Sequence, residues 1–265
     1  MGYSYAWGTL FNPGNAVDFF QLCSSQVTVN KASGFNRANA WLFSELSRLI
    51  YLRGGNETND ALQTAARNRF LHKVGLSECW FYNGKHIQCS IITTLPEHKQ
   101  PFTVLVFRGT QGTISNWLFN LSTALTAWPA GGQVHKGFSL LLMEAWEEIQ
   151  FQLKKISGPL YYTGHSLGGA LAVLTASLKK PDAVYTFGSP RIGNHEFVER
   201  TKHLHIYRVV NPRDIVAGIS PIPGMLHVGA THWLANSKEF DSRRSWFEAP
   251  GFLADHSPSN YTVQI

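Results

Sequence analysis

Short apolar segments alternate with helical patterns along this chain, and this alternation restricts the fold more than any other feature of the sequence. The most informative segment is 103–107, Thr-Val-Leu-Val-Phe, whose uninterrupted apolar side chains are typical of a strand covered on both faces. Further strands are predicted at 160–163, 184–187 and 205–210, and helices at 36–52, 58–73, 137–156, 166–178 and 194–202. This order predicts an α/β fold in which helices cover both faces of a mostly parallel sheet.

The composition is that of one globular domain. The 265 residues are 44% hydrophobic and 15% charged, which is sufficient for a sizeable core. No linker, internal repeat or low-complexity segment divides the chain. We therefore expect residues 1–265 to form a single domain.

Charge and histidine spacing argue against two classes of partner. The formal net charge is +6, but Lys and Arg never form a run longer than a pair, so nucleic-acid binding is not expected. His203 and His205 alternate at the start of a predicted strand, yet two nitrogens without a third ligand are weak evidence for a metal site. We expect neither a metal nor a cofactor.

The first twenty residues do not resemble a Sec-type signal peptide. Residues 1–20 contain no Lys or Arg, and Gly, Asn and Pro interrupt their apolar side chains. No apolar stretch elsewhere approaches the roughly 20 residues of a transmembrane helix. We expect a protein without a transmembrane segment, which is either cytoplasmic or exported by another route.

The three cysteines are an odd number, so at least one thiol stays unpaired within the chain. The Asn-Gly pair at 83–84 predicts a hairpin with a two-residue turn, which would place Trp80 opposite Ile87. In that register Cys79 and Cys89 point to opposite faces, so we expect reduced thiols.

Residues 164–168 read Gly-His-Ser-Leu-Gly and carry the strongest chemical signal. The pattern Gly-x-Ser-x-Gly occurs by chance in many chains, but here it follows a predicted strand and opens a predicted helix. That setting is typical of a nucleophile elbow, in which the two glycines let the backbone pass closely and Ser166 projects its hydroxyl above the sheet. The alternative is a glycine-rich turn in which Ser166 caps the helix.

A serine nucleophile needs a base and an acid that orients the base. In α/β hydrolases the acid and then the histidine follow the nucleophile along the chain. Asp214 comes directly after the strand at 205–210, and His256 lies in a late loop, so we predict these two residues. The alternatives are a turn aspartate at position 214, and His232 or His227 as the base.

The oxyanion of a tetrahedral intermediate needs fixed hydrogen-bond donors. The backbone N–H of Leu167, directly after the nucleophile, is predicted as the first donor. Thr110 follows the strand at 103–107 and is predicted as the second, through its N–H and its hydroxyl. An ordinary strand-end threonine is the alternative.

Residues 109–135 contain no Asp, Glu, Lys or Arg. Within them, apolar side chains recur at helical spacing, at Ile114, Trp117, Leu118, Leu121 and Leu125. Glycines and a proline flank this pattern, and we predict a lid over 111–129 that opens onto lipid and binds substrate. A fixed amphipathic helix packed on the sheet fits the same pattern.

Taken together, these motifs resemble the class 3 lipases, the fungal-type triacylglycerol lipase family, from about residue 102 to 261. The matching blocks are 106–110, 116–117, 134–138, 162–170, 186–194 and 208–211 with Asp214. The resemblance implies the α/β-hydrolase fold, a triad of Ser166, Asp214 and His256, oxyanion donors at Thr110 and Leu167, and an interfacial lid after Thr110.

The chain also departs from the family's pattern. Residues 215–218 read Ile-Val-Ala-Gly where the family usually has Pro soon after the acid, and Asn120 stands where an acidic lid residue is common. These differences concern the lid and the pocket. The signal peptide and paired cysteines of secreted fungal members are missing, so the chain looks closer to bacterial-type members.

The expected function is hydrolysis of lipid esters, as by a triacylglycerol lipase, at an oil–water or membrane surface. The alternatives on the same fold are a phospholipase A1, a feruloyl-type or short-chain esterase, and an acyltransferase. A non-catalytic binding protein on a hydrolase scaffold is a third class, which the presence of a candidate for every chemical role disfavours. The sequence carries no signal for the oligomeric state.

Overall fold

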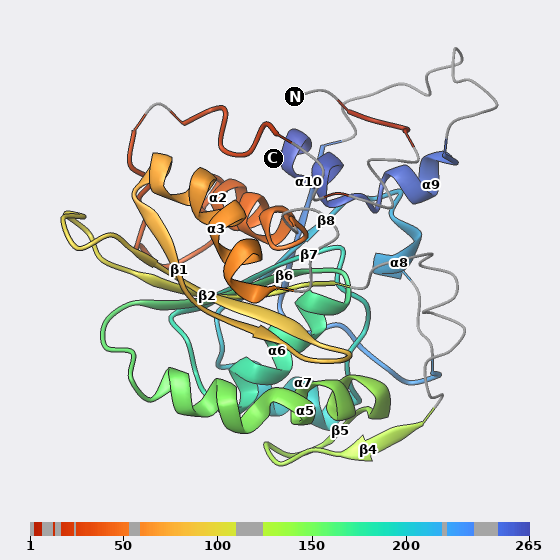
Figure 1. The fold of residues 1–265 in the computed structure, drawn as a ribbon. Helices are drawn as coiled ribbons and strands as arrows, with labels where there is room; N and C mark the ends of the chain where they lie inside the picture. Colours follow the sequence, from red (N-terminus) through yellow and green to blue (C-terminus); the bar gives the residue numbers. More distant parts are fainter. Residues whose placement is uncertain are drawn as a thin grey trace.

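The computed structural model describes residues 3–6, 13, 17–23, 25–52, 59–109, 124–218, 222–235 and 249–265. Within these ranges a seven-stranded sheet has the order β1-β2-β3-β6-β7-β8-β9, and β4 and β5 form a separate two-stranded sheet (Figure 1). The strands of the large sheet are β1 (Leu76–Asn83), β2 (Gln88–Thr94), β3 (Thr103–Phe107), β6 (Leu160–His165), β7 (Ala183–Phe187), β8 (Ile206–Val210) and β9 (Ala230–Trp233).

The strands β3, β6, β7, β8 and β9 pair in parallel, whereas the pairings of β1 with β2 and of β2 with β3 are antiparallel. This confirms the predicted α/β class. Every side chain of β3 and β6 is buried, which explains why the sequence of β3 carries no polar alternation. Strand β9 was not predicted, because it is a short edge strand whose four residues are exposed or half-buried.

The predicted two-residue hairpin turn is wrong. Asn83 pairs with Gln88, so the connection between β1 and β2 contains four residues, and Trp80 lies opposite Ile91 rather than Ile87. The longer turn is held from outside the hairpin, because the Nδ1 atom of His86 lies 2.9 Å from a Glu144 carboxylate oxygen. The hairpin also closes locally, since the N–H of Gly84 donates to the carbonyl of Ile87 at 3.0 Å, so the turn lies beyond the Asn-Gly pair.

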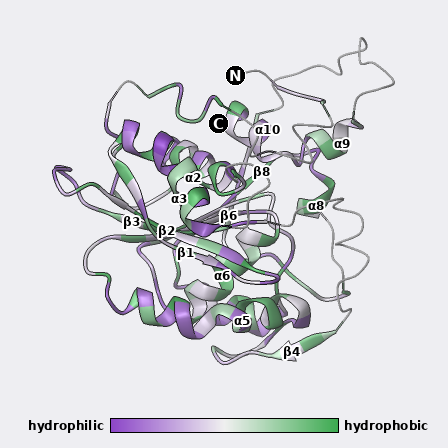
Figure 2. Cartoon of the chain, in the orientation of Figure 1, coloured by the Kyte–Doolittle hydropathy of each residue, from purple (hydrophilic) through white to green (hydrophobic). Residues whose placement is uncertain are grey.

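Helices cover both faces of the sheet. In Figure 1, α2 and α3 lie on one face, and α5, α6 and α7 on the other. Figure 2 shows apolar colours along α6, which is buried against β3, β6 and β7, and hydrophilic ones on parts of the outer helix α5. The helices are α2 (Arg37–Leu49), α3 (Asp60–Leu71), η2 (His72–Val74), α5 (Lys136–Leu153), α6 (Leu167–Leu178), α7 (His195–Thr201), α8 (Ile215–Gly218), α9 (Gly251–Ala254) and α10 (Pro258–Gln264).

The glycines around residue 166 let α6 lie directly against the strand ends. A Cβ atom on Gly168 would overlap the carbonyl oxygen of Phe107 at the end of β3, and one on Gly164 would overlap the backbone of Gly168. Larger residues at these two positions would push α6 away from the sheet. The sequence pattern around Ser166 is thus explained by close packing of a helix on two strands.

The described end of the predicted lid is not helical. Leu125 begins strand β4 (Leu125–Ala127), which pairs with β5 (Gln133–His135), so the helical spacing that included Leu125 is wrong at this position. Gly131 and Gly132, two of the glycines that flank the predicted lid, have φ angles of +98° and +74° and form the tight turn of this hairpin. Residues 110–123 lie outside the described part of the chain.

Candidate active site

Ser166 occupies a strained turn between β6 and α6. Its φ angle is +56° and its ψ angle is −125°, a conformation that costs a residue with a side chain about 1–3 kcal/mol. Its N–H donates to the carbonyl of Phe187 at 2.8 Å, which fixes the turn against the end of β7. Its side chain makes no capping hydrogen bond to α6, so the alternative of a simple helix cap is wrong.

Asp214 and His256 form a buried pair. The Nδ1 atom of His256 lies 2.9 and 2.8 Å from the two carboxylate oxygens, and both residues are almost fully buried. Because a carboxylate only accepts hydrogen bonds, Nδ1 carries the proton and Nε2 keeps its lone pair. Nε2 is buried and has no hydrogen-bond partner among the described residues. The imidazole therefore has the tautomer that a general base requires.

Asp214 is held by its own loop. It follows β8 and begins the short helix α8, and its Oδ1 atom accepts from the N–H of Val216 at 2.8 Å and from that of Ala217 at 3.4 Å. These donors fix the carboxylate with one side turned toward His256. Asp214 does lie in a turn, as the alternative interpretation of the sequence had it. The hydrogen bonds of this turn also orient its carboxylate toward His256.

Tyr261 is a residue of this site that the sequence analysis missed. It lies on α10, and its hydroxyl donates to Oδ2 of Asp214 at 2.7 Å and accepts from the N–H of Asn211 at 3.1 Å. Burial, followed by the charge of Asp214, raises the pKa of the Tyr261 phenol well above its usual value, so this group stays protonated. Helix α10 was not predicted, although Pro258 stands at its first position, where proline is favoured.

The loops that follow four parallel strands meet around these side chains. Gly188, after β7, has a φ angle of +59°, and a Cβ atom there would lie 2.6 Å from Oδ2 of Asp214 and 3.1 Å from Nδ1 of His256. Gly109, after β3, is close enough that a Cβ atom would lie 3.4 Å from the Cβ of Ser166. The structure thus brings Ser166, Asp214 and His256 to the carboxyl edge of the sheet, where parallel folds place their sites.

The other predicted residues have different outcomes. Leu167 begins α6 directly after Ser166 and is buried. His232 lies on β9 and stacks on Phe35, with ring centroids 3.8 Å apart, and Asp214 pairs with His256 instead. Five predicted residues lie outside the described part of the chain, namely Thr110, Ile114, Trp117, Leu118 and Leu121.

Asp255, next to His256, is held from three directions. Its Oδ1 atom accepts from the side chain of Asn211 at 3.0 Å and from the guanidinium of Arg213 at 3.1 Å, and it also accepts from the hydroxyl of Tyr3. Asp255 is fully buried, and these donors offset the cost of removing its charge from water. The loop that carries His256 is therefore tied both to the loop that carries Asp214 and to the start of the chain.

The described N-terminal residues lie along the same loop. The backbone of Ser4 exchanges two hydrogen bonds with the side-chain amide of Asn260, at 2.8 and 2.7 Å. The same amide donates to the carbonyl of Ala254 at 2.8 Å, and Tyr5 accepts from the N–H of Ala249. Segments that are far apart in the sequence thus support the position of His256.

We expect Asn260→Ala to lower the free energy of unfolding by about 1–3 kcal/mol, because it removes two hydrogen bonds to the backbone of Ser4 and one to the buried carbonyl of Ala254. Urea unfolding followed by circular dichroism measures this loss. The control is Asn83→Ala, which removes exposed hydrogen bonds to Asp60 and Gln88 and should change stability by less than about 0.5 kcal/mol. Equal losses in the two variants would contradict the account of Asn260.

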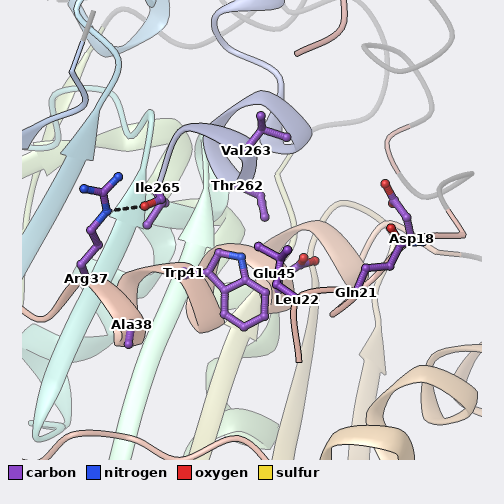
Figure 3. Close-up of a pocket in the computed structure, with 10 residues that line it drawn as sticks. All are labelled: Asp18, Gln21, Leu22, Arg37, Ala38, Trp41, Glu45, Thr262, Val263 and Ile265. Carbon is purple, nitrogen blue, oxygen red and sulfur yellow. Dashed lines mark hydrogen bonds between the residues drawn. The ribbon is translucent and has the colours of Figure 1, made fainter. Parts of the chain in front are cut away.

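A cavity of about 500 Å³ lies away from this site, between α2, α10 and residues 18–22 (Figure 3). Trp41 of α2 and Val263 of α10 face it, and the Arg37 guanidinium bridges to the carbonyl of Ile265 at one end. Ser166, Asp214 and His256 do not line it. Its lining residues are Asp18, Gln21, Leu22, Arg37, Ala38, Trp41, Glu45, Thr262, Val263 and Ile265.

None of the described helices combines the length and the apolar character that crossing a membrane requires. Within the described ranges, no group of three His, Cys, Asp or Glu side chains is arranged to hold a metal ion.

Comparisons with known proteins agree with this geometry. The family described as lipase (class 3) matches residues 104–223. Secreted mono- and diacylglycerol lipase 1 of Fusarium solani is 36% identical over 140 residues, which cover 46% of this chain and 40% of that protein. A lipase of Rhizomucor miehei is 33% identical over 156 residues, which cover 50% of this chain and 42% of that protein. Each match thus spans less than half the length of the relative.

A comparison of structures supports the fold. Lipase II of Rhizopus niveus superposes with a TM-score of 0.60 over 76% of this chain and 82% of that chain, at 23% sequence identity. At this level of identity the likeness concerns the fold alone. With its mostly parallel sheet between two helical layers, the chain has the α/β-hydrolase fold.

Proposed function

We propose that this chain is a member of the class 3 lipase family, whose model matches residues 104–223, and that it hydrolyses carboxylic esters of lipids through an acyl-enzyme. The observation that carries the proposal is the buried pair of His256 and Asp214 beside the strained turn of Ser166. The Nε2 atom of His256 has no hydrogen-bond partner among the residues that the structure describes, which supports its role as the base, since a base needs a free lone pair before substrate arrives.

In the proposed reaction, Ser166 Oγ attacks the ester carbonyl while His256 Nε2 takes the hydroxyl proton. The imidazolium that forms is stabilised by the carboxylate of Asp214, which is already held in position by hydrogen bonds from Val216 and Tyr261. His256 then passes the proton to the leaving alcohol, which breaks the ester bond and leaves an acyl group on Ser166. Water attacks this acyl-enzyme by the same steps in reverse and releases the fatty acid.

The negative charge on the carbonyl oxygen needs donors that are in place before the reaction. We assign this role to the backbone N–H of Leu167 and to Thr110. The position of Leu167 at the buried start of α6 supports the first assignment, since the helix dipole adds positive potential there. The second rests on the place of Thr110 after β3 and next to Gly109, which lies beside Ser166.

A lipid substrate is supported by the relatives named as lipases and by the charge-free segment 109–135. We propose that residues 111–129 gate access to Ser166 at an oil–water or membrane surface, within a single domain of residues 1–265. Apolar side chains at Ile114, Trp117, Leu118 and Leu121 would bind the acyl chain or the lipid surface.

The reaction is tested with a substrate panel of p-nitrophenyl esters, triglyceride emulsions, phosphatidylcholine vesicles and feruloyl esters. We expect hydrolysis of p-nitrophenyl esters and of triglyceride emulsions. A preference for phosphatidylcholine or for feruloyl esters would instead identify the respective alternative, and activity on short soluble esters alone would identify a plain esterase. Faster transfer to an added alcohol than to water would indicate an acyltransferase. No turnover of any ester, together with no labelling of Ser166 by a fluorophosphonate, would refute the proposal.

The lid makes a separate prediction about the physical state of the substrate. One ester, assayed below and above the concentration at which it aggregates, should be hydrolysed disproportionately faster above it, because the lid opens on the lipid surface. Trp117→Ala should reduce this increase, whereas Trp233→Ala, which changes an exposed tryptophan on β9, should not. A smooth rate profile that is the same in all three proteins would contradict a moving lid.

A further inference from the structure

We propose that His165, the residue before the nucleophile, is a positioning residue that joins the loop after β3 to the loop of the base. It does so through two hydrogen bonds, from Tyr51 to His165 and from His165 to the backbone of His256, with the Tyr51 hydroxyl packed against Gly109. The proposal rests on the proposed function, because it concerns how the same site is aligned.

The link to the base is a short hydrogen bond. The Nε2 atom of His165 lies 2.6 Å from the carbonyl oxygen of His256. A carbonyl only accepts, so Nε2 of His165 carries a proton and donates it. The backbone of His256 is thus fixed at its carbonyl by His165, while its ring is fixed at Nδ1 by Asp214. Two independent anchors leave the base little freedom to turn.

The link to the loop after β3 follows from the tautomer. With its proton on Nε2, His165 has a bare Nδ1, which lies 3.4 Å from the hydroxyl of Tyr51. Tyr51 therefore donates to His165, and its oxygen lies directly against Gly109, where an added Cβ atom would come within 2.3 Å of it. Gly109 directly precedes Thr110, the proposed oxyanion donor. Each donor of the two hydrogen bonds faces an acceptor, which is the arrangement that a buried polar network needs.

These hydrogen bonds connect parts of the molecule that are distant in sequence. Tyr51 follows α2, His165 ends β6 and His256 follows α9. All three side chains are buried, and the rings of His165 and His256 have centroids 4.6 Å apart. Burial and the nearby His256 lower the pKa of His165 well below its usual value, so the ring stays neutral. Its Nε2 atom therefore remains a donor and its Nδ1 atom remains an acceptor.

An apolar residue at position 165 would fill the same space but would leave two buried groups unpaired. These are the carbonyl of His256 and the hydroxyl of Tyr51, and each would shift toward another partner. A displacement of about 1 Å in a catalytic group lowers turnover by about 100-fold, even when the substrate still binds. A role in positioning thus predicts a loss in kcat with little change in KM.

The test compares two replacements at one position. His165→Gln keeps a donor for the His256 carbonyl and an acceptor for Tyr51, whereas His165→Met has a similar length and neither group. We expect kcat to fall by about 10- to 100-fold in His165→Met with KM within about twofold, and to recover most of this loss in His165→Gln. Equal kcat values for the two variants would overturn the proposal.

Tyr51→Phe tests whether the residues act as one series of hydrogen bonds. It removes the hydroxyl that donates to His165 and lies against Gly109, and we expect a smaller fall in kcat, of about three- to tenfold. Because both changes break the same series of hydrogen bonds, the double variant Tyr51→Phe/His165→Met should be no slower than His165→Met alone. If the kcat losses of the two single variants multiply in the double variant, the two residues act separately. That result would overturn the proposed series of hydrogen bonds.

The last measurement needs no activity. The ¹⁵N spectrum of the wild-type imidazoles, with His165 assigned by its absence in His165→Gln, should show a protonated Nε2 and a bare Nδ1. A proton on Nδ1 would overturn the proposal even if His165→Met fails to fold. An inactive wild-type protein would instead refute the proposed function, whereas an active wild type with an equally active His165→Met would refute only the role of His165.

Discussion

Ser166→Ala should lower the rate of ester hydrolysis by at least about 10⁴-fold and abolish labelling by a fluorophosphonate. The reason is that no other hydroxyl among the described residues occupies the turn at the end of β6, so no acyl-enzyme can form. The backbone N–H of Leu167 and the pair of His256 and Asp214 remain in this variant, and they account for any residual rate. Turnover of a p-nitrophenyl ester and labelling by the probe measure the two effects.

The control for this variant is Ser33→Ala, which removes a hydroxyl from an exposed loop. It should leave turnover and labelling unchanged. The Ser166→Ala protein should also keep the helical circular dichroism signal of the wild type, because the turn is held by backbone hydrogen bonds such as that from residue 166 to Phe187. A folded Ser166→Ala protein that still hydrolyses esters would exclude Ser166 as the nucleophile.

Asp214→Asn should lower kcat by about 10⁴-fold while the protein remains folded. The amide oxygen can still accept from Val216 and Ala217, which places the amide NH₂ toward His256. An NH₂ group donates to Nδ1 of His256 and thereby moves the ring proton to Nε2. That tautomer has no lone pair facing the nucleophile, so the base is lost although the ring stays in place.

A matched control for this variant exists at the opposite end of the sheet. Asp182 accepts a hydrogen bond from the N–H of Leu160 at 2.7 Å, and Asp182→Asn makes the same chemical change far from Ser166. It should keep turnover within about twofold, because an amide oxygen also accepts this bond. Similar kcat values for Asp214→Asn and Asp182→Asn would show that Asp214 does not orient the base.

Patterns within one element predicted the central part of the fold. Strand β3 was predicted with its observed bounds, and β7 was predicted to start one residue later than it does. Both were found because strands buried on both faces are continuously apolar. Helix α6 was predicted at 166–178, with Pro181 as its stop, and it spans Leu167–Leu178. These elements form from their own sequences, so local reasoning finds them. The predicted triad followed from the same elements, since Ser166 and Asp214 stand at the ends of predicted strands.

Features that depend on distant contacts were not predictable in this way. The connection between β1 and β2 has four residues, and its His86 contacts Glu144 of α5. Tyr261 reaches Asp214 only because α10 folds back across 47 positions of the chain. Leu125 belongs to a helical pattern by spacing, yet it pairs with His135 in a strand. In each case a partner lies in another element, and no local propensity reports it.

The contacts of residues 3–6 have a consequence for the order in which the protein folds. Tyr3 and Asp255 are 252 positions apart, and Ser4 and Asn260 are 256 apart, so these pairs close loops that span nearly all of the 265 residues. Closing such loops is slow and costs more chain entropy than forming the adjacent β6 and α6. The turn of Ser166 can therefore form early, whereas His256 reaches its final position only when both ends of the chain have met. During refolding, secondary structure should return before the ability to hydrolyse esters.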